Sequence, residues 1–342
     1  MNGVELLVKK SDEIGANPIW ITEQQVVSQL NLSQAMDTLE RTLLSEAQGK
    51  AKNLSKTHLM IAKNDAMHAL GASVSDSGLC GFKTWINVRG KSETIVSLFS
   101  TRDGSLKAII EATALGQLRT AAMTGVGTKY LAHRSADDMV VIGTGKQALP
   151  QIAACHIARP LKRLRIFSRN PKNRAKLQNC IQDQFDFDVI NSASLEEAIE
   201  GVGIITLITN STEPFLTSKM IIASAHINAM GAIVPVRVEF TTDIFPRCTI
   251  VAVDNIQNVK NLSSEFSNYY GKENNSWSDV KTIGQIIAEG TIRSEDSDLT
   301  LFKATGMGLS DLSIAIEIYH RVIGSKETHK TPERIKFHPI LK

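Results

Sequence analysis

The stretch from Met139 to Ala158 contains the pattern that most restricts the fold of this chain. An apolar run, MVVI, is followed by Gly143 and Gly145 and then by apolar residues at helical spacing. The turn reads G-x-G-x-x-A, with a strand before it and a helix after it. The first glycine permits a tight turn, the second lets the backbone approach a pyrophosphate, and Ala148 allows close packing of the helix on the strand. The stretch predicts a dinucleotide-binding turn, with a purely structural turn as the alternative.

The rest of the chain predicts an α/β protein with two domains. Residues 135–312 alternate apolar strands with helices, which is typical of a Rossmann-type parallel sheet covered on both faces. Residues 1–134 combine a helical pattern with short β-rich pieces separated by Gly, Asp and Ser, as in an α+β domain. A last helical pattern, DLSIAIEIYHRVIG, is expected to return to this first domain, which would then comprise residues 1–134 and 313–342.

Composition narrows the class of protein. The net charge of the 342 residues is only +3, and the tail from Arg321 to Lys342 has six Lys or Arg against two Glu. The remainder is nearly neutral, which argues against a nucleic-acid-binding surface. No apolar run approaches the ~20 residues of a membrane span, and the amino terminus lacks the apolar core of a signal peptide. Four scattered cysteines without metal-ligand spacing suit reduced thiols, so we expect a soluble cytoplasmic protein without a metal.

The end of the second predicted strand indicates which dinucleotide is bound. An acidic residue at this position usually binds the ribose hydroxyls of NAD, but here Ser168, Arg169 and Asn170 follow the strand LRIF. An acid would repel a 2′-phosphate, whereas Ser and Arg can hydrogen-bond it and balance its charge. NADP(H) is therefore the favoured cofactor, and NAD(H) remains possible.

Several separated motifs together resemble the ornithine cyclodeaminase/mu-crystallin family. They follow one another along nearly the whole chain, and as a set they are specific. The matching pieces are QLRTAAMTGVGTKYLA at 117–132, VVIGTGKQA at 140–148, ITNSTEPFL at 208–216, HINAMGA at 226–232, WSDVKTIGQIIAEG at 277–290 and TLFKATGMGLSDL at 300–312.

This resemblance implies a substrate and dimerisation domain beside a Rossmann domain, with the active site between them, in a homodimer. It implies an oxidoreductase that transfers hydride between a nicotinamide and a small amino or imino acid, as a ketimine or cyclic imino acid reductase or an amino acid dehydrogenase. One alternative is a lyase that converts ornithine to proline and ammonia while recycling NAD. Another is a cofactor-bound ligand-binding protein without turnover.

The resemblance also implies which cations meet the substrate. Arg119 matches the family's arginine in R-T-A-A, and its guanidinium can hold a carboxylate with two hydrogen bonds. Lys83 matches the lysine close to the reacting carbon, where it can hold the same carboxylate or relay a proton. Lys56 stands where the family usually has an arginine. Arg119 and Lys83 are the expected catalytic residues, and Ile233 and Thr305 are expected to line the substrate site with the three cations.

Cofactor contacts are assigned partly from the glycine turn and partly by resemblance. Lys303 and Ala304 lie in the family's F-K-S type motif near the nicotinamide, where alanine replaces the usual serine and offers only backbone or packing contacts. The full expected set is Gly143, Thr144, Gly145, Lys146, Gln147, Ala148, Ser168, Arg169, Asn170, Thr209, Met230, Gly231, Arg237, Lys303 and Ala304.

Two departures from the family bear on the reaction. Ile233 occupies the place of an aspartate that serves deaminating members as acid and base, and isoleucine exchanges no proton. The nearest acids, Glu239 and Asp243, are not expected to replace it, so the departure favours reduction of a C=N bond over cyclodeamination. The loop after Lys83 is also shorter than usual. Arg89 and Lys91 either add positive potential there or are solvated turn residues.

Overall fold

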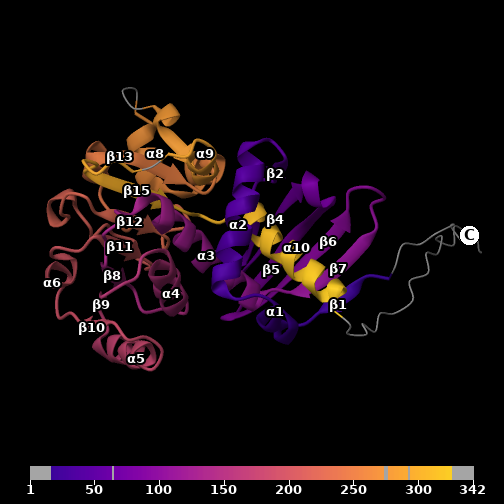
Figure 1. The fold of residues 1–342 in the computed structure, drawn as a ribbon, viewed down its shortest axis with the longest axis horizontal. Helices are drawn as coiled ribbons and strands as arrows, with labels where there is room; N and C mark the ends of the chain where they lie inside the picture. The colour runs from indigo at the N-terminus through magenta and orange to yellow at the C-terminus, as the bar shows by residue number, and fades with distance from the viewer. Residues whose placement is uncertain (1–16, 64, 273–275, 292, 326–342) are drawn as a thin grey trace, which may run out of the picture.

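The computed structural model describes residues 17–63, 65–272, 276–291 and 293–325, which form two β-sheets with helices packed around and between them (Figure 1). The predicted α/β class is confirmed. The predicted division into domains stays a prediction, and its terminal parts, residues 1–16 and 326–342, lie outside the described residues.

The first sheet is the parallel sheet expected from the alternating pattern. Its strand order is β10-β9-β8-β11-β12-β15-β13-β14, and every neighbouring pair is parallel. The strands are β8 (Asp138–Ile142), β9 (Arg163–Phe167), β10 (Asp188–Asn191), β11 (Ile204–Leu207), β12 (His226–Ala229), β13 (Cys248–Val253), β14 (Val280–Thr282) and β15 (Leu299–Lys303).

Alternating side chains of the parallel sheet bury helices on both of its faces. Met139 and Val141 of β8 pack in one cluster with α4 and α5, whereas Val140 and Ile142 pack in another with α6 and α8. This two-sided burial explains why the strands are almost wholly apolar. The helices of this part are α4 (Ala148–Ala158), α5 (Pro171–Gln182), α6 (Leu195–Ile199), α7 (Ile256–Leu262), α8 (Ser264–Tyr270) and α9 (Ile283–Ala288).

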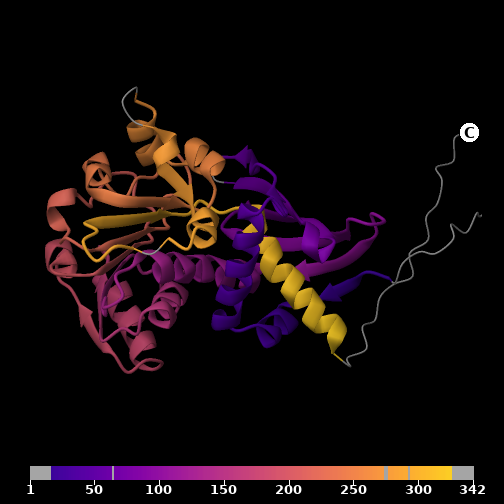
Figure 2. The ribbon, with the colours of Figure 1, turned by 45° about the horizontal axis from the view of Figure 1, so that its top comes forward.

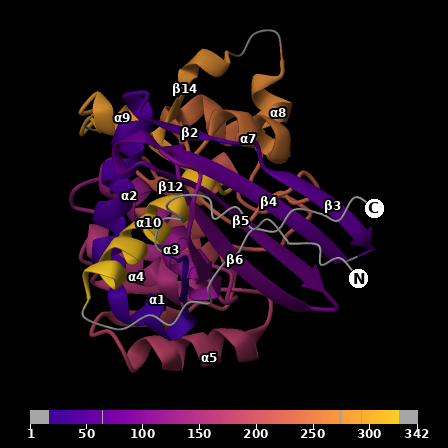
Figure 3. The same cartoon turned by 90° about the vertical axis from the view of Figure 1, so that its right-hand side faces the viewer.

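The second sheet is antiparallel apart from its first pair. Its order is β1-β7-β6-β5-β4-β2, with β3 beside β4, and Figure 3 shows β3 to β6 lying side by side. The strands are β1 (Ile19–Ile21), β2 (Ala51–Asn53), β3 (Thr57–Ala62), β4 (Asp65–Val74), β5 (Leu79–Val88), β6 (Lys91–Ser100) and β7 (Leu106–Glu111).

The two faces of this second sheet have different neighbours. One face carries Leu70, Lys83 and Val96, which are paired across β4, β5 and β6, and helix α10 (Gly308–Gly324) packs against it. Their strand neighbours Phe82 and Ile95 point to the opposite face and are exposed. Lys83 therefore lies on the side of the sheet that the helices cover.

Helices α3 and α10 join the two sheets. Helix α3 (Thr113–Leu131) packs against α4 of the parallel part and against α2 (Leu32–Ala47) and α10 (Gly308–Gly324) of the other; α1 (Glu23–Gln29) packs beside it. Helix α10 starts after β15 of the parallel sheet and then runs across β4, β5 and β6 (Figure 2). It begins at Gly308, ahead of the predicted return at residue 313. None of the helices in the described residues is long and apolar enough to cross a membrane.

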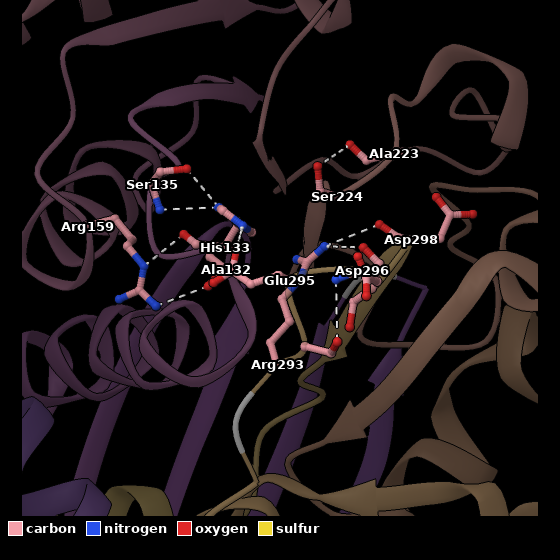
Figure 4. Close-up of polar contacts among 12 residues, drawn as sticks. Ala132, His133, Ser135, Arg159, Ala223, Ser224, Arg293, Glu295, Asp296 and Asp298 are labelled. Carbon is pink, nitrogen blue, oxygen red and sulfur yellow. Dashed lines mark hydrogen bonds and ion pairs between the residues drawn. The ribbon is translucent and has the colours of Figure 1, made fainter.

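The carboxyl end of α3 is bonded to the parallel part of the molecule (Figure 4). The Arg159 guanidinium, at the end of α4, donates to the carbonyls of Lys129, Ala132 and His133 at 2.9, 3.0 and 3.1 Å. Arg293 donates to the Leu131 carbonyl at 3.0 Å. These bonds satisfy carbonyls that the helix end leaves without partners, and they hold α3 in place relative to the parallel sheet.

A close contact at the start of α10 provides a test of this arrangement. A Cβ on Gly308 would overlap the backbone carbonyl of Gly71 in β4. We therefore expect Gly308→Ala to destabilise the protein by about 1–3 kcal/mol, because neither backbone can move freely. Urea unfolding measures the change. Gly324→Ala, at the exposed far end of the same helix with no atom within 4 Å of the added Cβ, is the matched control and should not destabilise. Equal effects of the two substitutions would contradict the close contact.

Candidate functional site

The glycine turn has the geometry of a dinucleotide-binding turn. Gly143 follows β8 with a φ of 120°, and its N–H donates to the Phe167 carbonyl at 2.9 Å. A Cβ on Gly143 would lie 2.5 Å from the Ile208 carbonyl oxygen, so only glycine fits. Gly145, in contrast, has no atom within 4 Å of an added Cβ, which leaves room beside its backbone. Helix α4 then begins at Ala148 without a side-chain cap, and the Ala148 N–H donates to the Gly145 carbonyl at 2.9 Å.

A cavity of about 540 Å³ lies beside this turn, at the carboxyl ends of β8, β9 and β11. It sits where the strand order reverses around β8, which is the usual ligand crevice of such sheets. Its wall contains these predicted cofactor residues: Gly143, Thr144, Gly145, Ser168, Arg169, Asn170 and Thr209.

The residues after β9 present no carboxylate to this cavity. The Thr144 hydroxyl donates to Ser168 Oγ at 3.2 Å, and the Ser168 hydroxyl donates to the Asn170 carbonyl at 3.3 Å. Arg169 is exposed at the cavity wall. The Asn170 side chain accepts from the Lys172 N–H at 3.0 Å, so it caps α5 as well as lining the cavity.

A second cavity, of about 390 Å³, lies where the two sheets and α3 meet. It brings together Lys56, Lys83 of β5 and Arg119 of α3, which the sequence places far apart. The glycine turn borders both cavities, since Gly145 lines the first and Lys146 the second. The other predicted residues in its wall are Gln147, Met230, Ile233, Ala304 and Thr305.

Lys83 and Arg119 share a buried carboxylate that the sequence analysis did not identify. Asp311, in the first turn of α10, has no exposed surface. Its Oδ1 accepts from Lys83 Nζ at 2.7 Å and from Arg119 Nε at 3.0 Å. Burial lowers the pKa of Lys83, and the Asp311 charge opposes that shift. Asp311 thus holds both cations in one orientation and stabilises their charge.

Two glycines leave room for these cations. A Cβ on Gly116 would lie 3.2 Å from Lys83 Nζ, and one on Gly306 would lie 3.4 Å from Arg119 Nη1. No described residue accepts a hydrogen bond from the terminal nitrogens of Arg119. The guanidinium therefore keeps donors available for a carboxylate in the cavity.

A second buried carboxylate, Asp254, orders the loop after β15. Its Oδ2 accepts from the N–H groups of Thr305 and Gly306 at 3.0 and 2.7 Å. Burial raises the pKa of Asp254, and these backbone bonds oppose the shift. In the same wall, Thr305 Oγ1 and Gln147 Oε1 are buried without a hydrogen-bond partner among the described residues. Such atoms suit a polar ligand, because an unsatisfied buried group is costly.

Lys56 differs from the other two cations. No described residue forms an ion pair or hydrogen bond with its ammonium, which lies 5.8 Å from the centre of the Trp85 ring. The Lys83 ammonium lies 5.3 Å from the same ring. The pKa of Lys56 is lowered to about 8, mainly because burial desolvates its ammonium and next because the charge of Arg119 repels it.

The acids near Ile233 have structural partners. Glu239 is fully buried and accepts from the N–H groups of Thr209, Gly231 and Ala232 at 2.6, 3.0 and 2.9 Å. It therefore joins the ends of β11 and β12 and does not face the second cavity. Asp243 accepts from the Ser218 hydroxyl at 2.7 Å on the far side of this region. Neither replaces the missing aspartate, and Ile233 adds an apolar side chain to the cavity wall.

The structure does not bring every predicted residue to a cavity wall. Ala148 is buried at the start of α4, and Gly231 packs against Thr209. Lys303 is fully buried with its Nζ 4.0 Å from Glu265 Oε1, and Arg237 lines neither cavity. Arg89 and Lys91, at the tight turn between β5 and β6, also lie outside both walls.

Sequence reasoning missed Asp311, Asp254 and Trp85. Asp254 ends the apolar run CTIVAV, so its place at the carboxyl edge of the sheet was a usable signal. Asp311 stands among apolar and small residues of GLSDL, where a charged residue implies a buried partner. No cluster of three or more His, Cys, Asp or Glu side chains that suits a metal occurs in the described residues.

Comparison with protein families identifies relatives of the chain. The model of the ornithine cyclodeaminase/mu-crystallin family matches residues 17–326. An alanine dehydrogenase from Archaeoglobus fulgidus is 29% identical over 324 residues, which are 90% of this chain and 97% of that protein. A Delta(1)-pyrroline-2-carboxylate reductase from Bacillus cereus is 29% identical over 245 residues, covering 71% of this chain and 74% of the other.

A solved structure has the same fold. An archaeal alanine dehydrogenase dimer with bound NAD superposes with a TM-score of 0.84 at 25% identity, covering 93% of this chain and 99% of that one. The likeness of fold therefore extends over both sheets.

Proposed function

Because the chain belongs to the ornithine cyclodeaminase/mu-crystallin family, we propose that it is an NAD(P)H-dependent oxidoreductase that reduces a small α-imino acid or reversibly oxidises the amino acid. The observation that carries the proposal is the second cavity, which joins three cations to the end of the glycine turn. The cations bind the substrate carboxylate at one end of the cavity. The rest of a small substrate then extends toward the glycine turn, where the nicotinamide enters. The relatives' activities, alanine dehydrogenation and pyrroline-2-carboxylate reduction, belong to this class.

The residues of the cavity have separate tasks in this reaction. Arg119 donates to the substrate carboxylate from its terminal nitrogens, and Lys83, which shares Asp311 Oδ1 with it, adds a second charge. Asp311 holds both donors before the substrate arrives, so little reorganisation is needed. The reduced nicotinamide supplies the hydride. Met230, Ile233 and Ala304 make an apolar wall that excludes water from the reacting carbon.

Ile233 favours reduction over ornithine cyclodeamination. Removal of an amine from an amino acid requires a group that takes up and returns protons near the substrate nitrogen. At the position where deaminating members have aspartate, isoleucine offers none, and Glu239 is engaged by backbone N–H groups. When the substrate arrives as an imine, no amine has to be deprotonated before hydride transfer.

We expect steady consumption of reduced cofactor with a cyclic imino acid such as pyrroline- or piperideine-2-carboxylate. Arg119→Ala should lower kcat/KM by about 100-fold, since it removes charge-assisted hydrogen bonds to the carboxylate. Arg89→Ala, at the exposed turn after β5, is the control and should leave kcat/KM unchanged. The assay panel includes ornithine and pairs of 2-oxo acid and amine, with cofactor absorbance and product followed together.

Other outcomes of this panel identify the alternatives. Ammonia and proline formed from ornithine without net change in cofactor absorbance would establish the lyase. Tight cofactor binding without turnover of any member of the panel would indicate a ligand-binding protein. Full activity of Arg119→Ala would contradict its role in holding the carboxylate.

We propose NADP(H) as the preferred cofactor, with NAD(H) as the alternative. The support is the absence of a carboxylate among Ser168, Arg169 and Asn170 at the described end of β9, together with the exposed guanidinium of Arg169 at the cavity wall. A 2′-phosphate there would gain an ion pair with Arg169 and a hydrogen bond from Ser168.

Arg169→Ala should weaken NADPH binding about tenfold or more and leave NADH binding nearly unchanged, because only NADPH carries the 2′-phosphate. Titration calorimetry measures both affinities. Lys176→Ala, farther along α5 and outside the cavity wall, is the control. Tighter binding of NADH than of NADPH by the unmodified protein would refute the preference.

We propose that two copies pair through the open face of the antiparallel sheet. Neighbouring strands place several exposed apolar side chains on this one face, around a hollow of about 540 Å³. A face of this kind is unfavourable in water and suits burial against a second copy. Its apolar residues are Leu59, Met67, Phe82, Ile86 and Ile95. The four cysteines are free thiols, in keeping with a cytoplasmic location.

Light scattering should therefore give a particle of twice the 37.4 kDa chain mass. Ile86→Asp should shift it toward the monomer, because a charge would be buried in the interface. Ile190→Asp, which changes an exposed isoleucine of β10 in the other sheet, should leave the mass unchanged. A monomeric unmodified protein would rule out this pairing.

A further inference from the structure

The three cations of the second cavity differ in what holds them. Lys83 and Arg119 both donate to Asp311 Oδ1, at 2.7 and 3.0 Å, on the buried side of the cavity. Lys56 has no such partner among the described residues and reaches the cavity from the segment between β2 and β3. The ammonium groups of Lys56 and Lys83 both lie within 6 Å of the centre of the Trp85 ring, at 5.8 and 5.3 Å. Lys56 therefore reaches the same end of the cavity as the paired cations.

This difference decides which cation can release a proton. Loss of a proton from Lys83 would remove the positive charge from its 2.7 Å bond to Asp311 and leave that carboxylate with the charge of Arg119 alone. An arginine does not release its proton at physiological pH. Lys146 also lines the cavity but belongs to the exposed glycine turn, at the cofactor end. Among the described residues at the substrate end of the cavity, Lys56 is therefore the cation that can lose a proton without breaking an ion pair.

We propose that Lys56 is the catalytic acid that delivers a proton to the substrate nitrogen during imine reduction. This inference rests on the proposed function and assigns a role within the same site. Hydride from the reduced nicotinamide forms the new C–H bond while the C=N π pair moves to nitrogen. That pair takes the proton from the Lys56 ammonium, which is left as a neutral amine and regains a proton from water. In amino acid oxidation the same amine accepts the proton.

The charges around Lys56 agree with this role. Desolvation is the largest influence on its pKa and Arg119 the next; both lower it, as Lys83 does, whereas Asp254 and Asp311 raise it. The resulting pKa of about 8 lies close to physiological pH, where a general acid is most effective. His68, stacked on Trp85, has its own pKa lowered by burial and by Lys56. Because Lys56 is protonated below its pKa, the rate of reduction should fall as pH rises through about 8.

Lys56→Arg separates proton delivery from charge. It keeps a cation where the family usually has arginine but cannot release a proton in this pH range. We expect kcat for a cyclic imino acid to fall about 100-fold, with little change in KM, and the decline of the rate near pH 8 to disappear. Lys56→Met should lower kcat similarly and also raise KM, because the charge is lost. Lys52→Arg, an exposed lysine of β2, is the matched control and should behave like the unmodified protein.

Competitive acetylation provides a readout that needs no turnover. The NADPH-bound protein is labelled at low reagent concentration across a pH series, and mass spectrometry follows Lys56 with Lys52 as an internal reference. Lys56 should become reactive as pH rises through about 8, the value to which burial and the Arg119 charge lower its pKa, about two pH units below the usual lysine value of ~10.4. Lys56 labelling that follows Lys52 would overturn the proposal.

The possible failures are distinguishable. If the unmodified protein turns over imino acids and Lys56→Arg keeps its kcat and pH profile, the Lys56 assignment is wrong and the proposed function stands. If the unmodified protein turns over no imino or amino acid, the proposed function and the proton step fail together, even where labelling finds a reactive Lys56.

Discussion

The site depends on one buried carboxylate, Asp311. A charge without exposed surface is stable only when cations compensate it, and Lys83 and Arg119 do so at one oxygen. These three residues come from α10, β5 and α3, so the same interaction ties three elements together. It also determines where the two cations lie before any ligand is bound. Folding brings the like charges of Lys83 and Arg119 together at a free-energy cost. A ligand that binds later therefore finds both cations already oriented.

The position of Asp311 follows from the path of the chain after β15. The strand ends in the parallel sheet, the loop from Ala304 to Met307 is held by Asp254 and Asn258, and α10 begins against Gly71. The loop therefore crosses from one sheet to the other and lines the second cavity as it does so. The glycine turn approaches from the opposite side. The proposed nicotinamide and carboxylate sites are neighbours because this loop and α3 both connect the two sheets.

Much of the fold and part of the site were predictable from local patterns. Alternating strands and helices predicted the parallel sheet. The glycines predicted a tight turn, and in the structure Gly143 has a positive φ while Gly145 leaves open space beside its backbone. Motif resemblance pointed to Arg119, Lys83 and Lys56, which line one cavity. The roles of Asp311, Asp254 and Trp85 were not predicted, since each acts on a residue that is distant in sequence. The ammonium of Lys303 is buried near Glu265, and the expected contact of Lys303 with the nicotinamide stays a prediction.

The sequence by itself determined the local chemistry: the steric freedom of Gly143, the absence of an acid after β9, and the loss of proton exchange at Ile233. These follow from the properties of single residues in a short stretch of backbone. Only the tertiary structure decided which cations are paired and which is free. Lys83 and Asp311 are separated by 228 positions, and electrostatic interaction depends on distance in space and on burial. Lys83 differs from Lys56 because folding brings its ammonium to 2.7 Å from the buried Asp311, whereas Lys56 pairs with no described carboxylate.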